Sequence, residues 1–405
     1  MSHSSIQVLP APAARTWLHV FAGFAASLVS IGLARFAYAP LVPALIHAHW
    51  FSSSSVVLLS AANLTGYLVG ALVGQPLARR FSDTQVLRAM MMLVALAFLA
   101  CAYPLSVGWF FAWRLMSGVA GGAIMVLVAA TVLPHVPQDR RGVAGGAIFL
   151  GVGIGIAGSG TVVPWLLGMG LQATWIGLAG MSAVLTLATW YAWPGPHEHA
   201  HAAYRVDAPA TPATEVAVPR AGLVVLFGQY GLMAVALVAP MVFLVDFVER
   251  GLHAGAAAGA HIWVLYGLGA VMGPPLYGWL GDRLGGRVAV RAALAVQALA
   301  MGTLGVASGD LALAAATVLI GTFPPGIVPL ALARVQELIP HDALAQNRAW
   351  SRATVSFATF QALAGYGYSA VFSVTGGQHR VLFAIGAAAL LVALMADVQR
   401  KRAAR

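Results

Sequence analysis

Two arginines lie inside long apolar stretches of this chain, and they are the residues best suited to bind a ligand. Arg35 lies a little past the middle of the stretch 17–44, and Arg114 lies nearer one end of the stretch 109–133. An ionisable residue at membrane depth costs about 2.5–3.5 kcal/mol on insertion scales, so it marks a candidate functional site. A guanidinium can bind a carboxylate through two parallel hydrogen bonds. The pair therefore predicts an aqueous cavity that attracts an anion, with Arg35 binding its carboxylate.

Neither arginine has an acidic residue at a similar depth, which favours a ligand as its partner. The 12 acidic residues lie in loops or near the ends of the apolar stretches. The alternative for each arginine is structural, with the guanidinium donating hydrogen bonds to the backbone carbonyls of a broken helix. The sequence alone leaves both roles open.

Two other patterns match known motifs without the structural context that those motifs need. The segment 197–201, HEHAH, matches the zinc-protease string HExxH, but it follows Pro194 and Pro196 in a stretch with the composition of a linker. The glycines of 153–158 match GxGxxG inside an apolar stretch, without the strand that precedes a dinucleotide-binding turn. We therefore expect no metal site, no cofactor and no enzymatic activity.

The composition indicates an integral membrane protein. Charged residues make up 8% of the 405 positions and apolar residues 60%, whereas soluble domains carry about 25% charged residues. This composition excludes soluble enzymes and disordered chains. The net charge of +10 includes no basic block before the last few residues, so we expect no nucleic-acid partner.

Twelve apolar stretches are long enough to span a bilayer, which requires about 20 residues. They lie at 17–44, 56–78, 86–107, 109–133, 142–168, 171–193, 221–246, 257–280, 288–308, 310–333, 350–374 and 379–397. The polar stretch 194–219, rich in Pro, Ala and His, has the composition of a flexible linker. The sequence thus predicts an all-α membrane protein with two six-helix halves, 1–193 and 220–405.

The basic residues predict how the chain is oriented in the lipid bilayer. With both termini on one side, that side holds 18 of the 22 Lys and Arg residues, the opposite side holds two, and two lie within spans. Short cytoplasmic loops carry an excess of Lys and Arg. We therefore expect both termini in the cytoplasm, and a multi-pass monomer in the inner (plasma) membrane of a bacterium.

The two halves repeat weakly at a constant offset of 203 residues. Gly118 aligns with Gly321, and the segment 87–96 aligns with 290–299. A parallel repeat of six helices is typical of transporters of the major facilitator superfamily (MFS), which bind substrate near the bilayer midplane between the halves. The chain therefore resembles an MFS transporter in its overall organisation.

The loop after the eighth apolar stretch carries the same resemblance. Residues 278–287, GWLGDRLGGR, resemble the superfamily signature GxLxDRxGxR at every fixed position, whereas the first-half copy at 75–83 lacks the Asp and the Gly. The resemblance implies that the Asp and its basic neighbours hold the cytoplasmic side closed in one state of the cycle. The implied gate residues are Gly278, Asp282, Arg283, Gly285 and Arg287. An ordinary basic loop is the alternative.

The first half resembles one branch of the superfamily more closely. Residues 32–43, GLARFAYAPLVP, resemble the GxxRFxxxPLxP opening of the YbfB/YjiJ-type branch, and 62–70, ANLTGYLVG, resemble its ANxxGYLxG. The glycine-rich segment 151–164 and Gln361 agree with this branch, although Gly365-Tyr366 stands where a Gly-Pro pair often follows. This resemblance implies a transporter but no particular substrate.

Other polar and aromatic residues at mid-depth are candidates to line the cavity. They are Tyr38, Asn63, Tyr67, Gln229, Tyr230, Tyr266, Gln361 and Tyr366. Each of them has the alternative of a hydrogen bond between helices. Asp246 and His261, near the outer ends of their spans, are weak candidates for proton coupling.

The sequence predicts a secondary transporter that moves a small organic anion by alternating access, with a proton or a counter-solute as its partner. It does not distinguish uptake from efflux, or symport from antiport. Proton-coupled efflux of amphipathic drugs is an alternative within the same class. A transporter-like sensor or a membrane enzyme is the alternative from another class, but no acid, base or metal ligands converge at one depth.

Overall fold

The computed structural model describes residues 13–137, 140–195, 220–307, 309–340 and 342–403, and the described regular elements are helices. Those before residue 196 are α1 (Ala13–Ser27), η1 (Leu28–Leu33), η2 (Phe36–Tyr38), α2 (Leu41–His47), α3 (Ser53–Phe81), α4 (Asp83–Cys101), α5 (Val107–Val132), η3 (Leu133–His135), α6 (Arg141–Leu167) and α7 (Leu171–Ala188). Those after residue 219 are α9 (Arg220–Asp246), η5 (Phe247–Gly251), α10 (Gly255–Leu284), α11 (Gly286–Val306), α12 (Asp310–Gly321), α13 (Phe323–Leu338), α14 (Ala343–Val374) and α15 (His379–Ala403). The predicted linker from residue 196 onward, with its HExxH string, lies outside the described residues.

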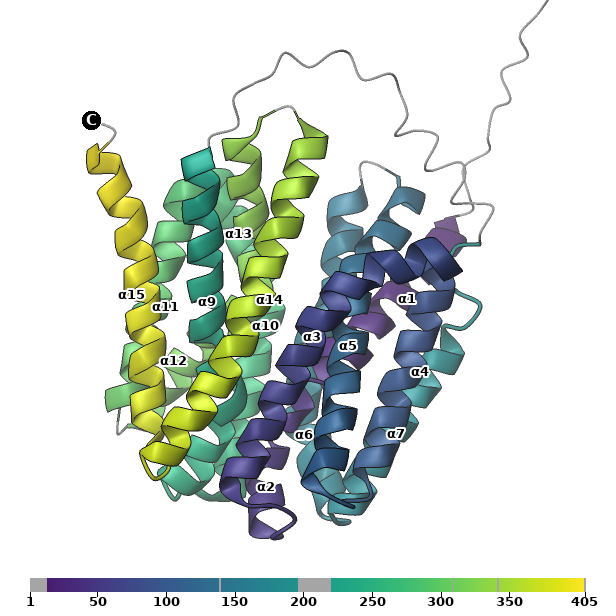
Figure 1. Cartoon of the computed structure of the whole chain (residues 1–405), viewed down its shortest axis with the longest axis vertical. Helices are drawn as coiled ribbons and strands as arrows, with labels where there is room; N and C mark the ends of the chain where they lie inside the picture. Colours follow the sequence, from purple (N-terminus) through teal and green to yellow (C-terminus); the bar gives the residue numbers. More distant parts are fainter. Residues whose placement is uncertain (1–12, 138–139, 196–219, 308, 341, 404–405) are drawn as a thin grey trace, which may run out of the picture.

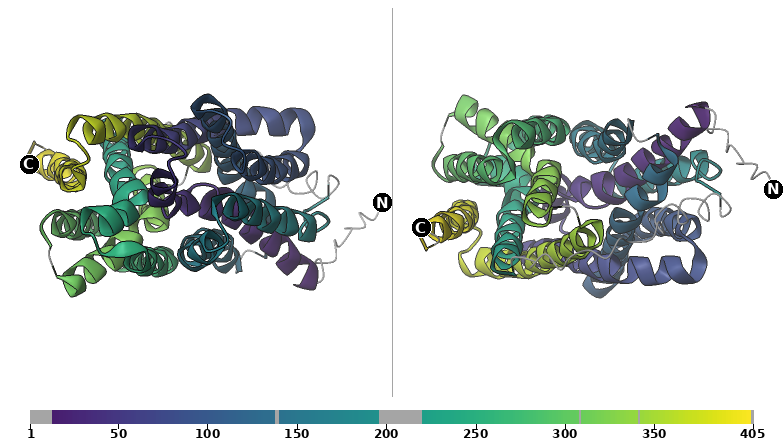
Figure 2. Two further views of the ribbon diagram at one scale, coloured as in Figure 1. Left: turned by 90° about the horizontal axis from the view of Figure 1, so that it is seen from below. Right: turned by 90° about the horizontal axis from the view of Figure 1, so that it is seen from above.

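The helices are arranged as two bundles that lie side by side (Figure 1). The first, purple to teal, is built from residues before 196, and the second, green to yellow, from residues after 219. α1 begins and α15 ends at the same end of the molecule, at the top of Figure 1, which we call the terminal face. The views along the bundles show the boundary between them, where α3 contacts α14 and α6 contacts α10 (Figure 2).

Within the described residues, ten helices are long and apolar enough to cross a membrane. α12 and α13 make an eleventh if the pair is counted as one span, with a bend of 42° between them. Two prolines stand in the first turn of α13, where they interrupt the helical hydrogen bonds. The predicted span 350–374 lies in α14, which has 32 residues. α14 is not among the ten helices counted above, and it packs between α3 and α9.

The sequence repeat is also present in the packing of the glycines. Gly70 on α3 lies against the backbone of Val119, and Gly273 on α10 lies against the backbone of Thr322 at the same offset of 203. A Cβ atom would stand 2.0 Å from a carbonyl oxygen at Gly70 and 2.1 Å at Gly273. Such close approach of backbones requires glycine and is typical of helix pairs in membranes.

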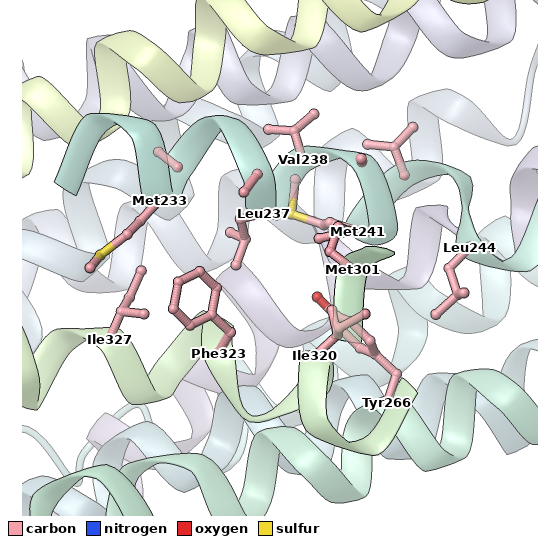
Figure 3. Close-up of a cluster of buried hydrophobic side chains, with 14 of the residues drawn as sticks. Met233, Leu237, Val238, Met241, Leu244, Tyr266, Met301, Ile320, Phe323 and Ile327 are labelled. Carbon is pink, nitrogen blue, oxygen red and sulfur yellow. The ribbon is translucent and has the colours of Figure 1, made fainter. Parts of the chain in front are cut away.

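The second bundle is centred on α9, whose apolar side chains point in every direction. Figure 3 shows Met233, Leu237 and Met241 of α9 near Phe323 and Ile327 of α13. A helix that is apolar all round is expected to be buried, and 89% of the most apolar window of 221–251 is buried. α9 is therefore the central helix against which the cavity described below is built.

The first predicted span is not one continuous helix. α1 passes into the wide turns of η1, the regular helix is broken at Ala34 and Arg35, and the chain continues through the short η2 to α2. Pro40 stands at the start of α2, and its ring would clash with the carbonyl four residues earlier if the preceding helix continued. Because of this break, the Arg35 side chain and the Ala34 carbonyl take positions that they would not have in a continuous helix.

Candidate functional site

Arg35 lies at this break, between the two bundles. Its Nη1 donates a hydrogen bond of 3.2 Å to Oε1 of Gln361 on α14. Its guanidinium carbon lies 4.0 Å from the centre of the Tyr67 ring on α3, within the range of a cation–π contact. Its Nη2 is buried and forms no hydrogen bond with a described residue. Arg35 therefore keeps an unused donor.

Arg114 reaches the same region from α5. Its Nη1 donates a hydrogen bond of 2.7 Å to the carbonyl of Ala34, and its guanidinium carbon lies 4.2 Å from the centre of the Tyr38 ring. The side chain is 3% exposed, and its Nε has no partner in the described chain. Arg114 thus has the structural role that the sequence left open, a bond to a broken helix, and still keeps a donor unused.

Asn63 connects α3 to α5 beside the two arginines. Its Nδ2 donates to Oγ of Ser117 at 2.9 Å and to the carbonyl of Arg114 at 3.4 Å. Its Oδ1 is buried and accepts no hydrogen bond from a described residue. The nearby Oγ of Ser60 is also buried and unpaired within the described chain. The site therefore contains an unused acceptor as well as unused donors.

These side chains surround a cavity of about 10 Å³, room for roughly one water molecule. It is lined by Arg35, Tyr38, Ala39, Ser60, Asn63, Leu64, Arg114, Met241 and Val242. Within the described residues no carboxylate pairs with either arginine, so two positive charges meet here. Because ligand sites usually measure about 300–1,000 Å³, the halves must separate to admit an organic molecule.

The other predicted cavity residues lie elsewhere. Gln229 donates to the carbonyl of Ala393 on α15 at 2.9 Å, so it has the alternative role of joining helices. Tyr230 packs on Phe357 within the second bundle, with ring centres 4.7 Å apart. Tyr266 stacks on Trp263, with ring centres 4.9 Å apart. None of these three side chains lines the cavity with the arginines.

Tyr366 belongs to a second pocket, between α3 and α14. Its hydroxyl accepts a hydrogen bond of 3.1 Å from Thr65 across the two bundles, and the residue is 38% exposed. The pocket has a volume of about 280 Å³ and is lined by Ser54, Ser55, Leu58, Tyr366, Ser369, Ala370 and Ser373. Tyr366 is therefore at the boundary between the halves, but it is not grouped with Arg35.

Comparisons with known proteins agree with this architecture. Residues 27–398 match the family described as "Uncharacterised MFS-type transporter YbfB". The chain belongs to this family. The family and its relatives are transporters, not enzymes, and the expected MFS fold is confirmed. A crystal structure of the nucleoside transporter NupG superposes with a TM-score of 0.73 at 13% identity, over 94% of this chain and 99% of that one.

The curated relatives match shorter segments. The 4-hydroxybenzoate transporter PcaK of Acinetobacter baylyi is 29% identical over 127 residues, which are 31% of this chain and 28% of the relative. A probable transporter of Streptomyces coelicolor is 28% identical over 267 residues, 65% of this chain and 61% of the relative. The chain thus spans less than two thirds of the length of these relatives.

The proposed gate of this MFS transporter lies at the terminal face. Gly278 and Asp282 lie near the end of α10; Asp282 is exposed and forms no ion pair with a described residue, whereas Arg283 lies over the ring of Trp279 at 4.9 Å. Gly285 has a φ of +74° and separates α10 from α11. Its conformation is one that glycine adopts at no steric cost.

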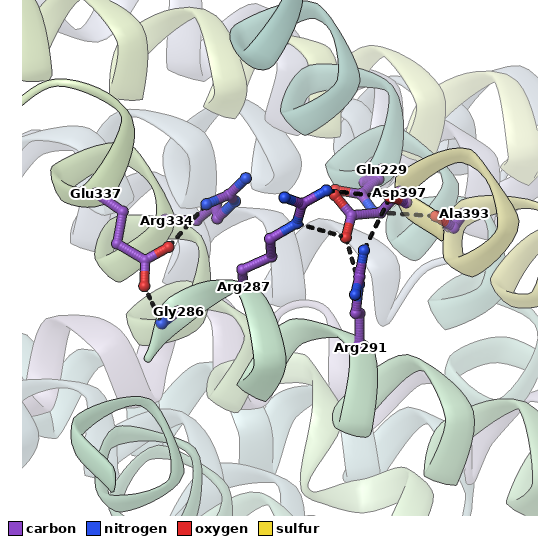
Figure 4. Close-up of polar contacts among 8 residues, drawn as sticks. All are labelled: Gln229, Gly286, Arg287, Arg291, Arg334, Glu337, Ala393 and Asp397. Carbon is purple, nitrogen blue, oxygen red and sulfur yellow. Dashed lines mark hydrogen bonds and ion pairs between the residues drawn. The ribbon is translucent and has the colours of Figure 1, made fainter. Parts of the chain in front are cut away.

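Arg287 of the same motif takes part in a network within the second bundle (Figure 4). Asp397 on α15 accepts from Nε of Arg287 at 3.1 Å and from Nε of Arg291 at 2.5 Å. Glu337 on α13 pairs with Arg334 at 2.7 Å and accepts from the N–H of Gly286. This network joins helices of one half, so Arg287 does not bridge the two halves in this conformation.

Described contacts between the halves lie at mid-depth and farther from the terminal face. Besides the bonds of Arg35 and Thr65, Nε1 of Trp263 donates to Oγ of Ser159 at 2.9 Å. Ser159 is in the last third of α6, which begins at the terminal face with Arg141. The ring of Phe36 lies 6.3 Å from that of Trp263. The bundles are therefore joined at mid-depth and toward the face opposite residues 278–287.

Of the two predicted proton-coupling residues, the structure buries one and exposes the other. Asp246 has an exposed fraction of 0% and pairs with Arg250 at 2.5 Å and with Nε2 of His379 at 2.6 Å. His261 is exposed. Sequence reasoning missed His379, which begins α15 and is 133 residues from Asp246.

Proposed function

We propose that this MFS transporter carries a small organic anion and that Arg35 binds its carboxylate. The observation that supports this is the pair of buried guanidinium groups at one cavity, each with an unpaired N–H and neither with an acidic partner in the described chain. A carboxylate supplies both a negative charge and paired acceptors. The relatives named for 4-hydroxybenzoate, which is a carboxylate, agree with this proposal.

The proposed cycle is alternating access, with the halves 1–193 and 220–405 rocking about the cavity and 194–219 linking them. The protein would work as a monomer in the inner membrane of a bacterium with both termini in the cytoplasm, because the basic residues gather on that side. Asp282 would then pair with basic residues of the other half when the terminal face closes. In this structure Asp282 is exposed and unpaired within the described chain, and the halves are joined on the side away from the terminal face.

We propose a proton as the coupling ion and the pair of Asp246 and His379 as its site. Asp246 lies one helical turn after Val242, which lines the cavity, so a change at the pair can be transmitted along α9. Glu249 and Arg250 are the charged groups beside it. Replacing His379→Gln keeps a hydrogen-bond donor beside Asp246 but removes the imidazole ring, so transport by the variant should no longer respond to an imposed pH gradient. An unchanged response in liposomes would exclude this site.

The anion proposal is tested by thermal unfolding of the purified protein in detergent. A ligand at about 100 times its dissociation constant adds about 2.7 kcal/mol to stability, so benzoate or an aliphatic carboxylate should raise the unfolding temperature and benzamide should not. Arg35→Ala should abolish the shift, and Arg35→Lys should retain part of it because the charge remains but the planar fork is lost. If amphipathic drugs stabilise the protein and carboxylates do not, the proposal is wrong and drug efflux is favoured.

A further inference from the structure

The unpaired atoms of the cavity specify more than a negative charge. We propose that the ligand is a hydroxy acid, in which a hydroxyl group donates to Oδ1 of Asn63 while the carboxylate binds Arg35. This inference rests on the proposed function and narrows its ligand class. It depends on which atoms of the site are donors and which are acceptors, and those identities follow from the neighbouring groups.

The orientation of the Asn63 amide is set by its partners. The carbonyl of Arg114 can only accept, and Oγ of Ser117 donates its own hydrogen to that carbonyl at 2.8 Å. Both neighbours therefore require a donor from Asn63, which must be Nδ2. Oδ1 is consequently a buried acceptor with no partner in the described chain, on a residue that lines the cavity. A carboxylate cannot satisfy it, because an ionised carboxylate has no hydrogen to donate.

The orientation of Gln361 follows in the same way. Nη1 of Arg35 is a donor, so the amide atom that faces it must be Oε1. Nε2 of Gln361 is then a buried donor without a described partner, on the same amide whose Oε1 accepts from Arg35. This Nε2 and the unpaired Nη2 of Arg35 come from different halves and suit the two oxygens of one carboxylate. A bound carboxylate would therefore be held by both halves.

The rings of Tyr38 and Tyr67 determine which edges of the guanidinium groups remain available. Each guanidinium lies over a tyrosine face, at 4.2 Å for Arg114 and 4.0 Å for Arg35. This stacking covers one flat face of each guanidinium, and Nη2 of Arg35 and Nε of Arg114 are the in-plane groups left without a described partner. Nε of Arg114 and Oδ1 of Asn63 thus present a donor and an acceptor on the first-half wall, which a hydroxyl can satisfy together because it both donates and accepts.

An acid without the hydroxyl would leave Oδ1 of Asn63 without a partner from the ligand. Sites built to hydrogen-bond a substrate hydroxyl reject analogues that lack it, because their buried polar groups are then left unsatisfied. We expect the hydroxylated member of a matched pair of acids to bind about 10- to 100-fold more tightly. The preference should persist at high salt, since it does not depend on net charge.

The experiment measures dissociation constants by calorimetry on the full-length protein in detergent, with two matched pairs: 4-hydroxybenzoate against benzoate, and lactate against propionate. The hydroxylated acid of at least one pair should bind about 10-fold or more tightly. Asn63→Leu should reduce that ratio to about one, whereas Gln229→Leu, which removes a buried amide far from the cavity, should preserve it.

The outcomes separate this inference from the proposal on which it rests. If none of the four acids binds, the anion proposal itself fails. If acids bind but neither pair shows a preference for the hydroxyl, the hydroxy-acid inference is overturned while the anion proposal stands. That comparison uses wild-type protein alone, so it does not depend on Asn63→Leu folding. A preference that survives in Asn63→Leu also overturns the role given to Asn63.

Discussion

The two halves share a backbone arrangement but differ in the side chains that they bring to mid-depth. At the offset of 203, the pairs are Arg35 and Val238, Tyr38 and Met241, Asn63 and Tyr266, Tyr67 and Ala270, and Arg114 and Thr317. The first member of each pair belongs to the polar cluster, and each second member is buried without a formal charge. Helix packing is thus similar in both copies, whereas the charged side chains that line the cavity come from the first half.

The largest expected effect tests the shared part of this comparison. Gly70→Ala and Gly273→Ala each place a Cβ about 2 Å from a carbonyl oxygen, so each should destabilise the protein by about 3 kcal/mol and by similar amounts. Gly158→Ala is the control, because no atom lies within 4 Å of the added Cβ. Thermal unfolding in detergent measures all three. Tolerance of one alanine but not the other would show that the packing is not equivalent.

The next effect tests the difference between the halves. Removing Arg35 with Arg35→Ala eliminates a charge-assisted hydrogen bond to the ligand and should weaken anion binding about 10- to 100-fold. Changing its counterpart with Val238→Ile should leave the dissociation constant within about twofold, because that position contributes only packing. Calorimetric titration with the best-bound acid measures both. If Val238→Ile weakens anion binding more than Arg35→Ala does, the assignment of ligand binding to the first half is wrong.

A smaller effect separates the two arginines. Arg114→Met leaves the carbonyl of Ala34 unpaired, so it should lower stability by about 1–3 kcal/mol in addition to weakening binding. Its counterpart Thr317→Val removes a buried hydroxyl that has no partner in the described chain, and stability should change by less than about 0.5 kcal/mol. The unfolding temperatures of the two variants measure this difference. Equal losses of stability would contradict the structural role of Arg114.

The smallest effect concerns the terminal face, where the halves make equivalent contacts with different chemistry. Thr84 donates to the carbonyl of Pro194 at 2.9 Å, and 203 residues later Arg287 donates to the carbonyl of Asp397 at 3.2 Å. Asp397→Asn should cost about 1 kcal/mol at low salt and less at 1 M salt, because the ion pairs are partly exposed. Thr84→Val should cost a similar amount that salt does not change. If salt changes the stability loss of both variants, or of neither, the proposed difference in chemistry between the two contacts is wrong.

The sequence predicted the long helices and the internal repeat. The helices, the repeat and the grouping of Arg35 with Asn63 and Tyr67 all follow from patterns in apolarity and motif spacing. The direction of single side chains did not follow, because successive residues turn by about 100° around a helix. In a uniformly apolar helix such as α9 no polar face shows which way Gln229 points.

Motif reading missed two other features, and only the first of them had a usable signal in the sequence. Met241 and Val242 line the cavity although nothing polar marks them, yet they stand 203 residues after Tyr38 and Ala39, which also line it. Applying the repeat to the site itself would have found them. The pairing of Asp246 with His379 joins the end of one helix to the start of another, and only the packed structure shows it.

The uncompensated arginines have an electrical consequence. An empty site with two positive charges becomes a site with one when a monovalent acid binds, and a neutral site when a divalent acid binds. Moving one elementary charge through a membrane potential changes the free energy by about 2.3 kcal/mol per 100 mV. The valence of the cargo would therefore decide whether the membrane voltage acts on the loaded half of the cycle as well as on the empty half, and current recordings with acids of different charge would measure the difference.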